Sequence, residues 1–122
     1  MTDKELLEKA AKAAGIEIRG NANKWIAQGV TELDLLVWND KGGDSVWNPL
    51  TDDGDALRLA VKLNLDITHS WSIVYGDDKY PMASIHVSYN NRTFVYELKE
   101  ADPYAATRRA IVRAAAEIGK TL

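Results

Sequence analysis

The sequence predicts an α+β fold in which a mainly antiparallel sheet packs with helices. Three observations predict it: helix start signals precede apolar residues at helical spacing, strand-like segments dominate the second half, and an Asn-Asn pair joins two of them. The chain has 122 residues, 46% of them hydrophobic, which suits one domain (1–122) with a modest core. We therefore expect an α/β/α sandwich-like arrangement.

Three helices are expected from their end signals. Thr2, with Glu5 three residues later, forms a capping box, and Gly15 supplies a stop. Asp102 before Pro103 is a strong start, because the missing N–H of proline costs nothing in a first turn. The expected helices span about 3–14, 52–63 and 103–118, and Gly119 is expected to end the last one.

The middle helix begins at Thr51 or Asp52, where carboxylates favour the positive end of the helix dipole. Its apolar residues surround most of its circumference, so we expect burial on more than one side, against a sheet and either another helix or a second subunit. These residues are Ala56, Leu57, Leu59, Ala60, Val61 and Leu63.

Strands are expected at about 33–39, 44–47, 66–75, 82–89 and 92–98, with a turn at 41–44 and a loop at 76–81. Residues 16–32 lack a clear pattern and are expected to form a loop. Asn90 and Asn91 tolerate the positive φ angles of a two-residue type I′ turn. Counting outward from this turn predicts four cross-strand pairs: Tyr89 with Arg92, Val87 with Phe94, Ile85 with Tyr96 and Ala83 with Leu98.

Composition limits the partners. A net charge of −3 disfavours direct duplex-DNA binding, which needs a clustered excess of Lys and Arg. The absence of cysteine fits a reducing compartment, and no apolar run approaches the roughly 18 residues of a membrane span. The first twelve residues lack the apolar stretch of a signal peptide. We expect a cytoplasmic protein with no membrane contact and no cofactor.

An acidic cluster is the candidate metal site. Asp52, Asp53 and Asp55 supply the oxygen ligands that Mg²⁺ and Ca²⁺ prefer, but they lack calcium-loop spacing. Helix capping explains the same residues and is the favoured interpretation.

The two histidines are both expected on strands. His69 shares strand parity with Trp71 and Ile73, which favours a buried histidine over a catalytic one. His86 lies between Ser84 and Ser88 on a polar strand face, where no nucleophile-elbow pattern surrounds either serine.

The last helix carries the best ligand candidates. Arg108, Arg109 and Arg113 form a basic flank, and the guanidinium group matches phosphate geometry. The alternative is a solvated flank that pairs with acidic residues. For a nucleotide ligand, Trp47 or Tyr104 would stack on the base, and Trp47 is the tryptophan expected to be partly exposed.

Two segments of the chain resemble the phage ABA sandwich family, small proteins of phage and prophage genomes. One is the Trp47-Asn48-Pro49 turn followed by Asp55-Ala56 and an apolar helix. The other, residues 102–113, is similar to the terminal helix of such proteins. The resemblance covers roughly residues 47–119 and implies a sheet layered between helices and a phage origin. It implies no catalytic residues.

These observations favour a non-enzymatic binding protein, expected to be a homo-oligomer. In a phage it would act in counter-defence, by sequestering a nucleotide signal or by blocking a host defence protein. One alternative is a regulatory or structural partner protein in phage replication or recombination. Another is a metal-dependent phosphoesterase that uses Asp52, Asp53 and His86.

Overall fold

The computed structural model describes residues 1–21, 35–38, 44–73, 81–90, 92–98 and 102–122. Within these residues, the helices are α1 (Asp3–Ala14), α2 (Asp53–Lys62) and α3 (Pro103–Lys120). The strands of the same residues are β1 (Ile18–Asn21), β2 (Leu35–Trp38), β3 (Asp44–Trp47), β4 (Asp66–Ile73), β5 (Pro81–Tyr89) and β6 (Arg92–Leu98).

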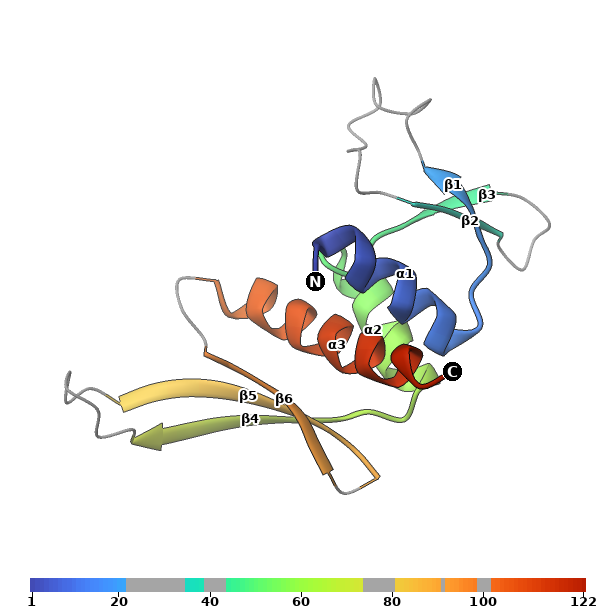
Figure 1. The fold of residues 1–122 in the computed structure, drawn as a ribbon. Helices are drawn as coiled ribbons and strands as arrows, with labels where there is room; N and C mark the ends of the chain where they lie inside the picture. The colour runs from blue at the N-terminus through green and yellow to red at the C-terminus, as the bar shows by residue number, and fades with distance from the viewer. Residues whose placement is uncertain (22–34, 39–43, 74–80, 91, 99–101) are drawn as a thin grey trace.

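All described strand pairs are antiparallel, and the predicted α+β class is confirmed. The strands form two three-stranded sheets, in the orders β1-β2-β3 and β4-β5-β6. Figure 1 shows the helices between these sheets, so the layer order is sheet, helices, sheet, whereas one sheet between helices was expected.

Helix α3 explains this order because it packs on two sides. Ala110 and Ala114 contact Ile85 and Val87 of β5. The other buried residues of α3 join α1, α2 and the first sheet in the larger core. Small side chains around much of a helix allow close approach from several directions. The residues of α3 in that larger core are Ile111, Val112, Ala115 and Ala116.

The predicted helix starts are confirmed. Thr2 Oγ1 accepts a hydrogen bond from Glu5 N at 3.2 Å, and the Asp52 carboxylate accepts one from Asp55 N at 2.8 Å. Asp102 Oδ1 accepts from the backbone nitrogens of Tyr104 and Ala105. Each side chain satisfies N–H groups that have no partner within the helix.

The predicted stop at Gly119 is wrong. Helix α3 continues to Lys120, and Gly119 is buried within it. Its backbone lies against the carbonyl group of Lys9 in α1, where a side chain would not fit. Glycine is therefore required here for close helix packing and not for ending the helix.

Helix α2 is buried on one side only within this chain. Ala56, Leu59 and Ala60 are buried, but Leu57 and Val61 are 62% and 67% exposed. The expectation that α2 is covered on more than one side is therefore wrong for the single chain, because neither sheet reaches its outer face.

The β5–β6 hairpin reverses at the predicted position but has a different register, and Asn91 of the predicted turn lies outside the described residues. Tyr89 pairs with Arg92, and Asn90 has the positive φ, 51°, that the turn requires. A β-bulge between Val87 and Ser88 then shifts the pairing by one residue, because it adds an unpaired residue to one strand. Val87 thus pairs with Val95, Ile85 with Glu97 and Ser84 with Leu98, so three predicted pairs are wrong.

The remaining differences lie in the first sheet. Residues 18–21 form strand β1, although they were expected to be loop, and β1 pairs irregularly with β2. The predicted turn at 41–44 and loop at 76–81 lie almost entirely outside the described residues, as do 22–32 and the strand ends at 33–34, 39 and 74–75. In the described parts of the chain, none of the helices is long and apolar enough to cross a bilayer.

Candidate functional site

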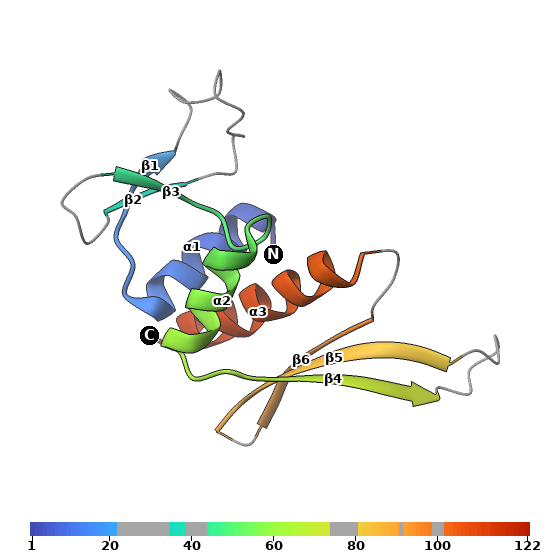
Figure 2. The ribbon, with the colours of Figure 1, turned by 180° about the vertical axis from the view of Figure 1, so that it is seen from behind.

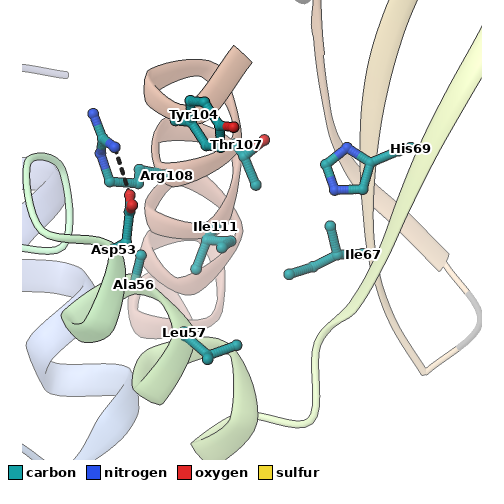
Figure 3. Close-up of a pocket in the computed structure, with 9 residues that line it drawn as sticks. All are labelled: Asp53, Ala56, Leu57, Ile67, His69, Tyr104, Thr107, Arg108 and Ile111. Carbon is teal, nitrogen blue, oxygen red and sulfur yellow. Dashed lines mark hydrogen bonds and ion pairs between the residues drawn. The ribbon is translucent and has the colours of Figure 1, made fainter. Parts of the chain in front are cut away.

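An open groove of about 370 Å³ lies where α2, α3 and the start of β4 meet. Figure 2 shows α2 in front of α3, with β4 passing below both. Grooves of this size with mostly apolar walls are the usual form of small-molecule sites. The described residues that line it, drawn in Figure 3, are Asp53, Ala56, Leu57, Ile67, His69, Tyr104, Thr107, Arg108 and Ile111.

Apolar side chains form most of the groove. Ile111 of α3 and Ile67 of β4 lie on opposite walls, and Leu57 of α2 borders the space between them (Figure 3). Tyr104 lies in the first turn of α3, and 70% of its surface is exposed. Exposed apolar groups that converge on one groove favour a ligand with apolar surface, because binding removes that surface from water.

The polar groups of the groove are largely engaged within the protein. The Thr107 hydroxyl donates to the carbonyl oxygen of Pro103 at 2.7 Å. Arg108 donates through Nε to the carbonyl oxygen of Leu50 at 2.8 Å, and through Nη1 to Asp53 Oδ1 at 2.6 Å. These bonds join α3 to the start of α2. Because the Arg108 side chain is only 16% exposed and its charge is paired with Asp53, it offers little free charge to a ligand in the groove.

The structure brings together two of the five residues predicted to bind a ligand, Arg108 and Tyr104. Arg109 instead binds the Asp3 carboxylate of α1 at 3.1 Å. Arg113 does not line the groove and also has an interaction partner. Trp47 is buried in the core with the helices, so its expected partial exposure is wrong.

Each aspartate of the predicted metal cluster has a structural hydrogen bond. Asp52 caps α2 and Asp53 binds Arg108. Asp55 is buried, accepts from Asn48 N at 3.0 Å and binds Arg58 Nη2 at 2.8 Å. Among the residues with described positions, no three His, Asp or Glu side chains gather as a metal site would require.

The histidines differ from each other in exposure. His69 is exposed and lines the groove, so the expectation that it is buried is wrong. His86 is half-buried on β5, between buried Ile85 and Val87, and it also has an interaction partner. This alternation fits the predicted polar face of the strand.

Sequence patterns did not identify most of the groove. Ile67, His69, Thr107 and Ile111 come from two elements whose contact depends on the fold. The four-residue spacing of Leu57 and Val61 indicates an apolar helix face, but it does not show whether other parts of the protein cover that face. No family model, curated protein or solved structure matches the chain.

Proposed function

We propose that the chain is a non-enzymatic binding protein whose site is the groove between α2, α3 and β4. Its ligand would carry a planar aromatic ring, such as a nucleobase. The observation that supports this most directly is the exposed Tyr104 ring beside an apolar groove. A base would stack on Tyr104 and contact Ile67 and Leu57 with its apolar edge.

The charges of the site favour recognition of the ring over recognition of phosphate. Among the described residues that line the groove, Arg108 is the one Lys or Arg side chain, and Asp53 already binds it. A phosphate would have to displace this carboxylate. We therefore expect a nucleoside and its phosphorylated forms to bind with similar affinity and with little dependence on salt.

The resemblance to phage proteins extends this proposal. In an infected cell, the protein would act in the cytoplasm and sequester a nucleotide signal of the host defence. The groove could also block a host protein, or bind a partner in phage replication or recombination, since Leu57 beside it is an exposed apolar residue. The phosphoesterase alternative has less support, because Asp52 and Asp53 are engaged in capping and in an ion pair.

Titration calorimetry with a panel of nucleosides, nucleoside monophosphates and cyclic nucleotides tests the proposal. We expect heat of binding from at least one member, and Tyr104→Ala should weaken that binding about 5- to 150-fold, the range for loss of about 1–3 kcal/mol of base stacking. Tyr104→Trp should retain it. Glu117→Ala, a change at an exposed position of the same helix, is the matched control. No heat from any member, or unchanged binding by Tyr104→Ala, would refute the site.

A further inference from the structure

Helix α2 presents an uncovered apolar stripe. Leu57 and Val61 lie four residues apart, so they share one face, and both are largely exposed. They face away from Leu59 and Ala60, which are buried in the core. Two adjacent large aliphatic side chains form an exposed apolar surface, and its burial by another protein would be favourable.

Strand β4 presents an unprotected sheet edge next to this stripe. Within the described strands, β4 pairs with β5 alone, over eight residues without a register shift. Residues 67–73 contain no Lys, Arg, Asp, Glu or Pro. Natural proteins guard edge strands with such residues, with bulges or with short length, because an open edge pairs readily with another strand.

The other three edge strands have such protection. β6 carries Arg92 and Glu97, and its pairing with β5 contains a bulge. β1 carries Arg19 and pairs irregularly, and both β1 and β3 are four residues long. Strand β4 is therefore the edge best suited to pairing.

The stripe and the edge lie on the same side of the molecule. Leu57 of α2 and Ile67 of β4 border the same groove (Figure 3). A protein that adds a strand beside β4 would therefore also meet the outer face of α2.

We propose that this protein is a second copy of the chain, related by a twofold axis. Antiparallel pairing of β4 with its copy would join two three-stranded sheets into one, with both α2 helices on the same face of it. The start of α2 carries the exposed carboxylates of Asp52 and Asp53, the second of which also binds Arg108, and the last turn of α2 carries the exposed Lys62. A surface that carries both signs of charge can pair with its own copy across a twofold axis, with acidic groups opposite basic ones.

The same symmetry avoids repulsion between the two copies of the one acidic residue of β4. Asp66, the only charged residue of the strand, would lie at opposite ends of the pair. Leu57 lines both the groove and the proposed interface, so dimerisation would close that side of the groove. The inference does not depend on the proposed ligand, and its test needs none.

Sedimentation velocity of the full chain over a range of concentrations tests the dimer. We expect a species of twice the 13.5 kDa chain mass. Leu57→Glu and Val61→Glu should each raise the dimer dissociation constant about tenfold or more, because each puts a carboxylate into the apolar contact of both copies. Leu122→Glu, at an equally exposed apolar residue of the C-terminus, should leave it unchanged. Circular dichroism checks that each variant is folded.

A second variant tests the strand contact separately. Thr68 is exposed on β4, and Thr68→Lys adds a charge of the kind that guards natural edges. It should also shift the equilibrium to monomer. A wild-type chain that remains monomeric at high concentration would overturn the proposal, as would a dimer that neither the α2 variants nor Thr68→Lys weaken.

Discussion

Gly119 of α3 lies against the carbonyl group of Lys9 in α1, at a distance that excludes a side chain. A methyl group on Gly119 would come within 2.8 Å of the Lys9 carbonyl carbon. The backbones of the first and last helices thus meet directly, and the surrounding alanines allow the same close approach.

This contact predicts that Gly119→Ala lowers the stability of the protein, which is opposite to the usual effect of this change within a helix. In an isolated helix the change would stabilise by about 1 kcal/mol, because glycine is a poor helix former. Here we expect a loss of about 1–3 kcal/mol, the usual effect of overpacking. Urea denaturation measures it, with Lys120→Ala as the neighbouring exposed control. A more stable Gly119→Ala variant would contradict the close contact.

Asp55→Ala should destabilise the protein by about 1–3 kcal/mol. The Asp55 carboxylate accepts a hydrogen bond from the buried backbone nitrogen of Asn48, and its loss leaves that N–H group without this acceptor. Arg58→Ala removes the ion pairs of the exposed Arg58 side chain with Asp55 and Asp52 and should cost less than about 1 kcal/mol. Equal losses in chemical denaturation of the two variants would show that the ion pair, not the buried N–H bond, is the important interaction.

Arg108 and Arg109 should differ in their effects on stability. Arg108→Lys loses the Nε bond to the Leu50 carbonyl, which an ammonium group cannot replace in the same geometry. We expect a loss of about 1–2 kcal/mol from this partly buried site. Arg109→Lys, at a half-exposed pair with Asp3, should change stability by less than about 0.5 kcal/mol. Thermal unfolding of both variants checks this order, and the reverse order would refute it.

Asn64 follows α2 in the left-handed conformation, with φ of 53°. Asn64→Gly should be neutral or slightly stabilising, because glycine adopts this conformation without strain. Asn64→Val should cost about 1–2 kcal/mol, since a β-branched residue is strained there. Denaturant unfolding of the pair measures the difference, and identical stabilities would contradict the observed backbone conformation.

Local signals predicted the helices and the hairpin turn well. Thr2, Asp52 and Asp102 each accept the expected capping bonds, and the turn pair Tyr89–Arg92 is present. The β-bulge beside Val87 was not predicted, because no turn residue marks it and its cost depends on packing against α3. Strand β1 was missed for a related reason, since its pairing with β2 spans residues far apart in the chain.

The candidate site was predicted only in part. Tyr104 and Arg108 were identified by residue type and do line the groove. The alternative that the arginines of α3 pair with acidic residues is confirmed for Arg108 and Arg109. The sequence did not reveal that the partners are Asp53 and Asp3, because these come from other helices.

The sequence by itself determined where each helix begins and how the β5–β6 chain reverses, because capping groups and turn residues act over a few neighbouring positions. Only the tertiary structure decided that the helices lie between two sheets, that Gly119 serves a helix contact, and that Leu57 borders an open groove. These features depend on which surfaces meet after folding, and such contacts join residues that no short sequence pattern connects.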